Sequence, residues 1–260
     1  MKAIKIGLQI QAISAQQIEC LLSNEKERIH ASYFPEEEKL VYTEEFELTA
    51  TMRIIEFQFK KVLRSAINGK LQLGQKIECV FFEDFPFVKE SDFKHYIRVD
   101  RRCNDLKITT SKTGLKEVAK IFADGSHASE LNQSAYAGFI EMPAGNQQIY
   151  SRTFDQGSSN MMELLAVLEG LEMLQSEDRI QVNTDSRFVI RGLAQWIHFW
   201  QHNNWQTAQG QEVKFANYWQ KINRLCEGKL MEFKWIKGHS GHEKQDFCHQ
   251  LAHESAIQKK

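Results

Sequence analysis

The first residues of the chain alternate between apolar and polar side chains. Every second position from Ile4 to Ile10 is isoleucine or leucine, and a period of two is typical of a half-buried strand. The sequence Ser-Ala-Gln-Gln at 14–17 has the spacing of a capping box, which predicts that a helix begins there. Residues 36–67 carry apolar side chains three and four positions apart, so we expect a helical region that ends at the Asn-Gly pair at 68–69.

Residues 70–110 contain shorter apolar clusters, at 80–82 and 96–99, which predict short strands. We therefore expect residues 1–115 to form a small α+β accessory domain that ends in the polar stretch TTSKTGLKE. In hydrophobic pattern, this region resembles half of a phosphopantetheinyl transferase, through the segment LSNEKERIHASYFPEEEK and the helix after it. The metal-binding and cofactor-binding motifs of that family are absent from the sequence, so the resemblance implies no site.

From residue 116 onward, the pattern of apolar positions changes. Three strand-like segments, KIFADGS, YAGFIEM and QIYSRTF, are followed by the amphipathic helix pattern NMMELLAVLEGLEML. Strand and helix patterns then alternate to the end of the chain, with RIQVNTDS and LMEFKWIKG as strands. Three antiparallel strands followed by this alternation predict an α/β domain, a mixed sheet with helices on its faces, over 116–260.

The composition is that of a globular protein, with 42% hydrophobic and 26% charged residues among 260. No apolar run is long enough for a signal peptide or a membrane span. Five scattered cysteines without a C-x-x-C pair are typical of a cytoplasmic protein. The net charge of −1 gives no overall attraction to nucleic acid. Residues 94–120 nevertheless hold eight Lys or Arg against three acids, which indicates either a solvated linker or a phosphate-binding strip.

Three acids occupy positions that suit metal-assisted chemistry. Asp124 and Asp185 each follow an apolar strand, at the edge where open α/β sheets bind ligands. Glu163 lies beside the core-facing positions of a helix, where an unpaired charge is unfavourable. Converging carboxylates repel one another, and divalent cations relieve the repulsion and can assist phosphoryl chemistry. Each acid taken alone is equally typical of a turn or a helix surface, so the hypothesis depends on their joint placement.

The segment WIKGHSGHEKQDFCHQLAHE, residues 235–254, contains three histidines with three candidate roles. His239, His242 and His249 could be zinc ligands, a proton shuttle or surface residues. The scattered cysteines argue against a structural zinc site. The choice therefore depends on what else the fold brings to this segment.

Residues 119–257 resemble a type 1 ribonuclease H. The matching pieces follow that family's order and nearly its spacing, and they are FADGS, SSNMMELLAVLEGLE, VNTDSRFVIRGLAQWIHFW, NNWQTAQGQEVKFANYWQKI and FKWIKGHSGHEKQDFCHQLA. The resemblance implies a five-stranded mixed sheet with flanking helices. It also implies an endonuclease that hydrolyses the RNA strand of RNA–DNA hybrids with two Mg²⁺ or Mn²⁺ ions. The alternative is a hybrid-binding or scaffolding protein with weakened catalysis.

The resemblance also implies roles for individual residues. Asp124, Glu163 and Asp185 become metal ligands. His239 matches a mobile histidine that assists proton transfer or product release, which suits an imidazole because it exchanges a proton near neutral pH. The positions implied to contact the substrate are Gly125, Ser126, Ser158, Ser159, Asn160, Arg187, Trp196 and Trp200. Spacing alone would place Trp196 and Trp200 in the core, since they lie one helical turn apart.

The sequence departs from the family at the fourth metal ligand. Ten positions after His239, where the family carries an acid, stands His249. Histidine can ligate a divalent metal, but it brings no negative charge and suits Mn²⁺ better than Mg²⁺. Asp246, three residues earlier on the same helix, is the alternative ligand. We expect His242 to be a surface residue.

A second departure concerns the grip on the substrate. The family's basic residues that follow the tryptophans are replaced by Gln-His-Asn-Asn at 201–204. The loss of these cations should weaken hybrid binding. We therefore expect either the basic stretch at 94–120 or the N-terminal domain to compensate. The N-terminal domain is accordingly a candidate for binding nucleic acid or a protein partner.

Overall fold

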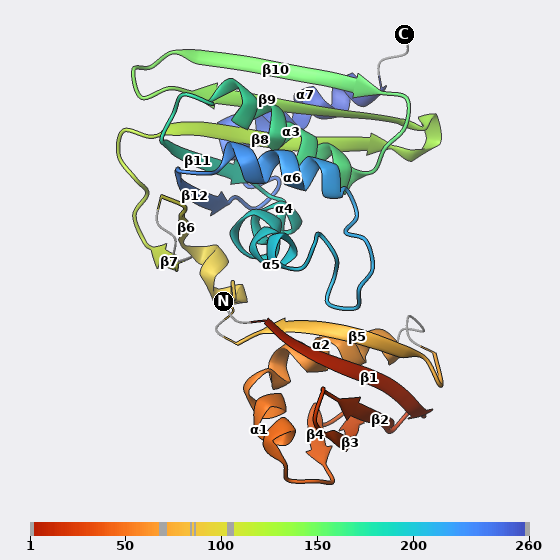
Figure 1. Cartoon of the computed structure of the whole chain (residues 1–260). Helices are drawn as coiled ribbons and strands as arrows, with labels where there is room; N and C mark the ends of the chain where they lie inside the picture. The colour runs from red at the N-terminus through yellow and green to blue at the C-terminus, as the bar shows by residue number, and fades with distance from the viewer. Residues whose placement is uncertain (1–2, 68–71, 84, 86, 103–106, 258–260) are drawn as a thin grey trace. The chain divides into compact units, whose positions relative to one another are not determined.

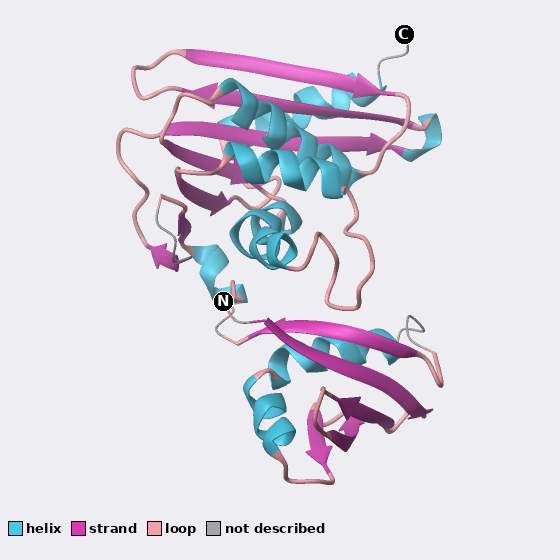
Figure 2. Cartoon of the chain, viewed as in Figure 1, coloured by secondary structure: helices cyan, strands magenta, loops and turns pink. Residues whose placement is uncertain are grey.

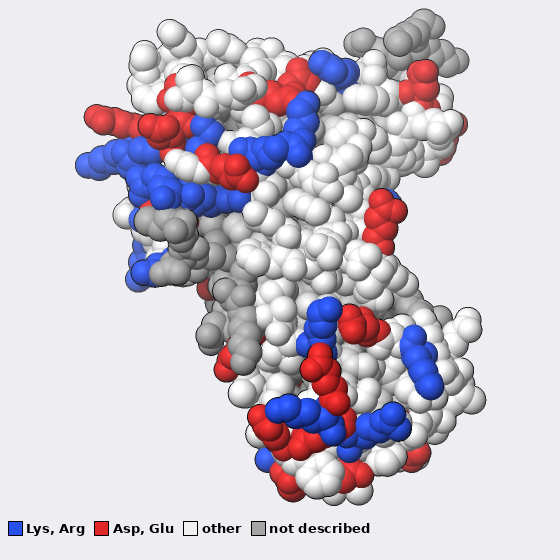
Figure 3. All heavy atoms as spheres, viewed as in Figure 1, with Lys and Arg blue, Asp and Glu red and all other residues white. Residues whose placement is uncertain are grey.

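The computed structural model describes residues 3–67, 72–83, 85, 87–102 and 107–257 (Figure 1). The chain divides into two compact units. Unit 1 comprises Met1–Phe85 and Phe199–Lys214, and unit 2 comprises Pro86–His198 and Phe215–Lys260. On the face shown in Figure 3, basic and acidic side chains are interspersed on each unit, in keeping with the net charge of −1. Among the helices of the described ranges, none combines the length and apolar character needed to cross a membrane.

Unit 1 is an antiparallel sheet with two helices, in the strand order β4-β3-β2-β1-β5 (Figure 2). Its elements are β1 (Ala3–Ile13), β2 (Ile18–Ser23), β3 (Arg28–Phe34), β4 (Lys39–Tyr42), α1 (Glu47–Ile54), α2 (Glu56–Ile67) and β5 (Lys76–Phe82). The strand predicted over 4–10 is confirmed as part of β1. Its buried side chains share one core with those of the two helices, where Phe59 of α2 packs edge-to-face on Phe81 of β5.

The helix start predicted at 14–17 is wrong, because this segment is the turn between β1 and β2. The backbone N–H of Ser14 donates to the carbonyl of Gln17 (2.9 Å), and the N–H of Gln17 donates to the Ser14 hydroxyl (3.0 Å). A serine that caps a helix and a serine that closes a hairpin make similar hydrogen bonds to the residue three positions later. In this chain, the pairing of β1 with β2 shows that the segment is a hairpin turn and not the start of a helix.

The helical region predicted over 36–67 is correct only in its second part. Residues 39–42 form the edge strand β4, and the remainder is broken into α1 and α2 at Ile55. Ile55 ends α1 with its N–H donating to the carbonyl of Thr51, and its side chain is fully buried. The predicted helix end at 68–69 lies outside the described residues.

Unit 2 is built on a seven-stranded sheet in the order β10-β9-β8-β11-β12-β6-β7. Its strands are β6 (Tyr96–Asp100), β7 (Lys107–Ser111), β8 (Ala119–Ala128), β9 (Gln133–Glu141), β10 (Gln147–Phe154), β11 (Arg179–Thr184) and β12 (Leu230–Trp235). Strands β8, β9 and β10 form an antiparallel meander, and β8, β11 and β12 run parallel. The predicted mixed sheet is therefore confirmed.

Helices cover both faces of this sheet, with α3 and α6 on one face and α7 on the other (Figure 1). The helical elements are η1 (Glu90–Lys94), η2 (Ser129–Leu131), α3 (Ser159–Met173), α4 (Arg187–Arg191), a π-helical turn (Gly192–Trp196), α5 (Ile197–His202), α6 (Ala216–Leu225) and α7 (Glu243–Ile257). The π-helical turn begins at Gly192, where a Cβ would lie 2.1 Å from the buried ring of Trp219, so no larger residue fits there.

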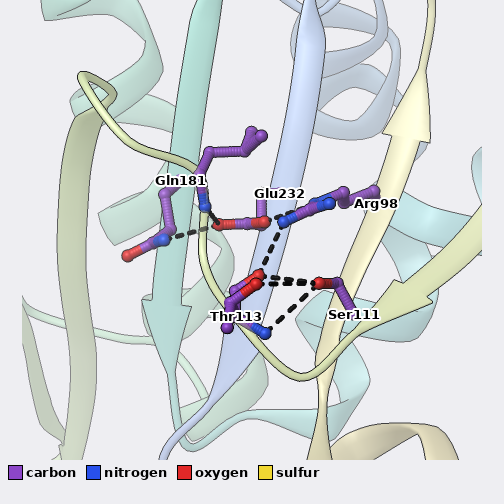
Figure 4. A network of polar contacts seen from close by, with 6 residues as sticks. Arg98, Ser111, Thr113, Gln181 and Glu232 are labelled. Carbon is purple, nitrogen blue, oxygen red and sulfur yellow. Dashed lines mark hydrogen bonds and ion pairs between the residues drawn. The ribbon is translucent and has the colours of Figure 1, made fainter.

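The expected five strands are confirmed as β8 to β12, and β6 and β7 extend the same sheet beyond β12 to seven strands. Both strands precede residue 116, where we expected the domain to begin. The contact that holds β6 in place is buried: Arg98 Nε donates to Glu232 Oε2 at 2.6 Å, and the Glu232 side chain is fully buried (Figure 4). Gln181 Nε2 (2.6 Å) and the N–H of Leu115 (2.9 Å) donate to the other oxygen of Glu232.

This network crosses the strands of the sheet. It joins β6, β11 and β12 to the segment that leads into β8, since Arg98 Nη2 also donates to the carbonyl of Thr113 at 2.6 Å. A buried carboxylate is tolerated only when it is paired and hydrogen-bonded. The buried carboxylate of Glu232 therefore depends for its ion pair on β6, in addition to its partners elsewhere in the sheet.

Candidate active site

Strand register brings Asp124 and Asp185 to the same level of the sheet. Strands β8 and β11 are parallel neighbours, and Asn183 pairs with Phe122. Asp124 stands two residues after Phe122, and Asp185 stands two residues after Asn183. The two aspartates therefore lie at the same level along the sheet and point toward the same face. Asp124 lies within β8, where it pairs with Ala137 of β9, and is only 4% exposed. Asp185 directly follows β11.

Glu163 reaches the aspartates because β8 and α3 approach each other very closely. A Cβ atom on Gly125 would lie 2.3 Å from the backbone nitrogen of Glu163 and 2.6 Å from the carbonyl carbon of Met162. No side chain fits at this position, so the glycine after Asp124 permits the contact. Gly125 thus has a structural role beside the substrate contact predicted for it.

The electrostatics of the three acids are those of buried, neighbouring carboxylates. Burial, and to a smaller extent the charge of Asp185, raise the pKa of Asp124 to about 6, although the contact with His249 acts in the opposite direction. Burial raises the pKa of Glu163 to about 7, with smaller contributions from Asp185 and Asp124, while the hydrogen bond from Ser186 acts in the opposite direction. Burial also raises the pKa of Asp185. Desolvation and mutual repulsion both disfavour the charged forms, so the cluster favours a nearby cation.

His249 is the histidine that contacts the acids. It projects from α7, and its Nδ1 lies 2.8 Å from Oδ2 of Asp124. Of the two candidates for the fourth metal ligand, His249 therefore makes a contact with the acid cluster. The backbone N–H of Asp246 donates to the carbonyl of His242 at 2.9 Å, as part of the first turn of α7.

His239 lies beside His249, with ring centroids 4.6 Å apart in an edge-to-face arrangement. Its backbone is left-handed (φ 54°), a conformation unfavourable for a residue with a side chain. The preceding Gly238 passes so close to Asp185 that a Cβ would lie 2.8 Å from Oδ2. The loop between β12 and α7 therefore holds the imidazole at the edge of the acid cluster.

His242 is exposed, as predicted, yet it also has a structural role. Its Nδ1 accepts a long hydrogen bond from the N–H of Gln245 (3.5 Å) at the start of α7, and its ring packs on Phe122 with centroids 5.4 Å apart. It is therefore a capping residue that covers part of the sheet.

The residues predicted to contact the substrate lie at several places. Ser158 caps α3 by accepting from the N–H of Met161 (3.4 Å), and Ser159 and Asn160 are exposed in the first turn of that helix. Ser126 follows Gly125 on β8 and is half-buried. Ser158, Ser159 and Asn160 thus lie at the N-terminal end of the helix that carries Glu163, and their contact with the substrate stays a prediction.

The two tryptophans are divided between the units. Trp196 belongs to unit 2, where it is half-buried against Phe188 with ring centroids 5.8 Å apart. Trp200 belongs to unit 1 and is also half-buried. Its carbonyl accepts from the N–H of Trp205 at 2.8 Å.

Three contributors to the site were not predicted. The Ser186 hydroxyl donates to Oε2 of Glu163. The hydroxyl oxygen of Ser186 also accepts from the N–H of Val189 (3.3 Å) and so caps α4. Trp235 donates its indole N–H to the carbonyl of Asp185 at 2.9 Å. Gly238 makes room for the carboxylate of Asp185. Only Ser186 left a signal in the sequence, because a serine before a helix is a typical cap.

The donor set fits a pair of hard divalent cations, although within the described ranges no three His, Cys, Asp or Glu side chains are already arranged as a complete metal site. The carboxylate oxygens of Asp124 and Glu163 are engaged by His249 and Ser186, in hydrogen bonds that a cation could replace. Oxygen ligands of this kind are those that Mg²⁺ and Mn²⁺ prefer. The raised pKa values of these acids indicate that positive charge would stabilise the ionised cluster.

Comparisons with known proteins identify a family for this chain. The RNase H family model matches residues 116–257. A ribonuclease H of Actinobacillus pleuropneumoniae serotype 5b (strain L20) is 35% identical over 136 residues, which are 52% of this chain and 88% of that protein. A ribonuclease H of Escherichia coli O9:H4 (strain HS) is 32% identical over 143 residues, covering 55% of this chain and 91% of that protein.

Solved structures show likeness at lower identity. LC9-RNase H1, described as a type 1 RNase H with the type 2 active-site motif, has a TM-score of 0.47 and 22% identity, covering 55% of this chain and 74% of its own. The foamy viral protease-reverse transcriptase, solved in complex with RNA/DNA hybrid, has a TM-score of 0.50 and 11% identity, covering 96% and 38%. At such identity the likeness concerns the fold alone.

Proposed function

We propose that this chain, which belongs to the RNase H family, hydrolyses the RNA strand of RNA–DNA hybrids by a two-metal-ion mechanism. Membership of the family makes it a ribonuclease H enzyme. The observation that carries the mechanism is the convergence of Asp124, Glu163 and Asp185, whose pKa values are all raised by burial. Bound cations would offset the repulsion between these carboxylates and favour their ionised forms.

Asp124, Glu163, Asp185 and His249 would hold the ions. Once bound, divalent cations would supply activation of a water molecule and stabilisation of the leaving 3′ oxygen of a phosphodiester. The chain's own groups orient this set: Ser186 holds the carboxylate of Glu163, and Trp235 holds the backbone of Asp185.

Hydrolysis breaks the bond between phosphorus and the 3′ oxygen, and leaves a 5′-phosphate and a 3′-hydroxyl. The attacking water loses a proton and the leaving oxygen gains one. His239 lies beside His249 at the edge of the cluster, and its imidazole can take up or release a proton near neutral pH. We therefore assign it to proton transfer or product release.

Substrate contacts are proposed for the first turn of α3 and the adjoining strand. Ser159 and Asn160 are exposed there, and the N-terminus of a helix favours phosphate. The backbone at Gly125 and the side chain of Asn160 would sense the 2′-hydroxyls that distinguish RNA. The further contacts in the proposal are Ser126, Ser158, Arg187, Trp196 and Trp200.

The location and partners of the whole chain are also proposals. The four cysteines in the described ranges are free and buried, namely Cys20, Cys79, Cys226 and Cys248, which supports a reducing cytoplasm. Unit 1 is proposed to bind nucleic acid or a protein partner, since the cations expected at 201–204 are absent from the sequence.

One observation favours a second function, hybrid binding with weakened catalysis. His249 replaces an acid and therefore removes one negative charge from the metal site. Cleavage of a labelled RNA–DNA hybrid by the full chain, beside matched DNA and RNA duplexes and with Mg²⁺ or Mn²⁺, separates the two functions. Asp124→Asn serves as the inactive control. Equal cutting of duplex DNA would overturn the proposed substrate, and hybrid binding without cleavage in either metal would favour the second function.

A further inference from the structure

Two arginines of α4 reach the same carboxylate. Nη1 of Arg187 lies 2.8 Å from Oε2 of Glu90, and Nη2 of Arg191 pairs with Oε1. The arginines stand four positions apart, which places them on one face of the helix. Glu90 is the first residue of η1, and its side chain is 66% exposed. One exposed carboxylate therefore pairs with two guanidinium groups.

Aromatic rings hold both guanidinium groups in place. The Cζ atom of Arg187 lies 4.3 Å from the ring centroid of Trp235 and 5.1 Å from that of Phe93. The Cζ atom of Arg191 lies 5.3 Å from the same Phe93 ring, which is only 2% exposed. Stacking restricts a guanidinium while leaving its N–H edge free to donate. The two donor edges are thus oriented before any ligand arrives.

This pair is tied to the proposed catalytic acids. Arg187 stands two residues after Asp185, and Trp235, on which it stacks, donates to the Asp185 carbonyl at 2.9 Å. An anion bound between the arginines would therefore have a fixed position relative to Asp185. A nucleic acid that enters the acid cluster carries phosphates on both sides of the scissile bond.

We propose that Arg187 and Arg191 form a binding site for a backbone phosphodiester, and that Glu90 occupies this site as an internal competitor until nucleic acid displaces it. The proposal rests on the proposed function only in that the substrate is a nucleic acid. A carboxylate and a phosphodiester each present two oxygens that guanidinium N–H groups can bind in parallel. Exposed ion pairs contribute little net stability, so a phosphate in a polyanion can replace Glu90.

The competing interpretation is a surface ion pair that merely anchors η1. Under that interpretation, removal of the Glu90 charge alters stability and leaves nucleic-acid affinity unchanged apart from a general charge effect. Under the proposal, the same change releases two oriented cations. Counterion release then makes binding depend more steeply on salt, which an anchoring role would not do.

The test measures binding of a short labelled RNA–DNA hybrid to the full chain in EDTA, so that cleavage does not interfere. Glu90→Gln is expected to lower Kd by about 3- to 10-fold and to steepen the slope of log K against log salt by about one. Glu227→Gln, which removes the same charge from an exposed residue outside both the proposed site and the basic stretch, is the matched control and should change both quantities little. Glu90→Asp, which keeps the charge but changes the side chain, controls for any disturbance of η1 by a substitution at this position.

The double variant Arg187→Gln/Arg191→Gln completes the design. In that background Glu90→Gln should no longer raise the affinity, because the site it blocks is gone. A gain that persists there, or a gain equal to that of Glu227→Gln, would overturn the proposal. Duplex DNA is the second arm: a similar gain identifies phosphate as the ligand, and a gain confined to the hybrid would contradict that assignment. Cleavage of hybrid by the wild-type chain is scored separately, so failure of this proposal leaves the proposed function intact.

Discussion

His249 Nδ1 and Asp124 Oδ2 lie 2.8 Å apart, which joins the last helix of unit 2 to the most buried acid of the site. An acid at position 249 would add a fourth carboxylate to a cluster in which burial and repulsion already raise the pKa values. The imidazole instead offers a neutral nitrogen to a metal, or a hydrogen bond to the aspartate. The metal chemistry of the site should therefore respond to this one side chain.

Replacing His249 tests its role as a ligand. His249→Asp is expected to shift the metal preference toward Mg²⁺, because the added carboxylate favours a hard cation. His249→Ala should lower hybrid cleavage by about 10-fold or more with either metal. Calorimetric titration with each metal, beside cleavage assays, gives a readout independent of turnover. If Asp246→Asn abolishes cleavage while His249→Ala leaves it intact, the fourth ligand is Asp246.

The raised pKa values predict how pH affects the stability of the metal-free protein. The pKa values of Asp124 and Glu163, about 6 and about 7, exceed the ordinary values that these groups have in the unfolded chain. The folded state therefore binds protons more tightly, and the free energy of unfolding should fall as pH rises from 4 through 7.

The matched variants make this pH effect specific. Asp124→Asn should raise the unfolding free energy at pH 8 by roughly 1–3 kcal/mol and have a smaller effect at pH 5. Urea denaturation in EDTA measures this, and Asp155→Asn on an exposed loop is the control. Added Mn²⁺ should stabilise the wild type at pH 8 more than the variant. An equal effect of Asp124→Asn at both pH values would contradict the repulsion argued for the cluster.

Gly125→Ala should disturb both stability and activity. The added methyl group would overlap the backbone of α3 at Glu163, and backbone atoms cannot move aside as a flexible side chain can. We expect a loss of about 1–3 kcal/mol in unfolding free energy. Cleavage should fall further than stability alone explains, because Glu163 moves away from Asp124. Thermal unfolding and cleavage rates are compared with those of Ser129→Ala, a change at an exposed position, and normal behaviour of Gly125→Ala in both would refute the close approach.

The buried pair of Arg98 and Glu232 predicts a large effect on folding. Arg98→Ala leaves the fully buried carboxylate of Glu232 without its cation, which should cost about 3–5 kcal/mol of unfolding free energy. Glu232→Gln added to that variant should recover much of the loss, because the buried charge is removed. Chemical denaturation of both variants measures the recovery. A double variant as unstable as Arg98→Ala would show that the charge of Glu232 is not the cause.

The acid cluster could be predicted from the sequence because its members follow local patterns. Asp124 and Asp185 come after apolar residues of two strands, and Glu163 stands near the start of a clear helix. Asp124, however, lies within β8 and not at its end, so the register of β8 with β11 brings the two aspartates together. The resemblance to the family pointed to His249, ten positions after His239, and its Nδ1 contacts Asp124.

Features that depend on distant partners could not be predicted. Strand β6 joins β12 through Arg98 and Glu232, which are 134 positions apart in the sequence. No local sequence pattern indicates that Arg98 pairs with Glu232. The turn at 14–17 has the sequence pattern of a helix cap because turns and caps use the same serine hydrogen bonds. Glu90 meets Arg187 across 97 positions, and its own neighbourhood in the sequence is typical of an ordinary surface.

The placement of β6 and β7 decides which strand meets water at that edge of the sheet. Without them, β12 would present unpaired backbone groups beside its buried Met231 and Phe233. An open edge of this kind is a template for pairing with other chains and for aggregation. The edge is instead β7, a five-residue strand of polar composition that begins with a lysine, and such strands discourage pairing. A fragment cut where the family pattern begins is thus expected to aggregate, whereas one that begins before η1 should aggregate less.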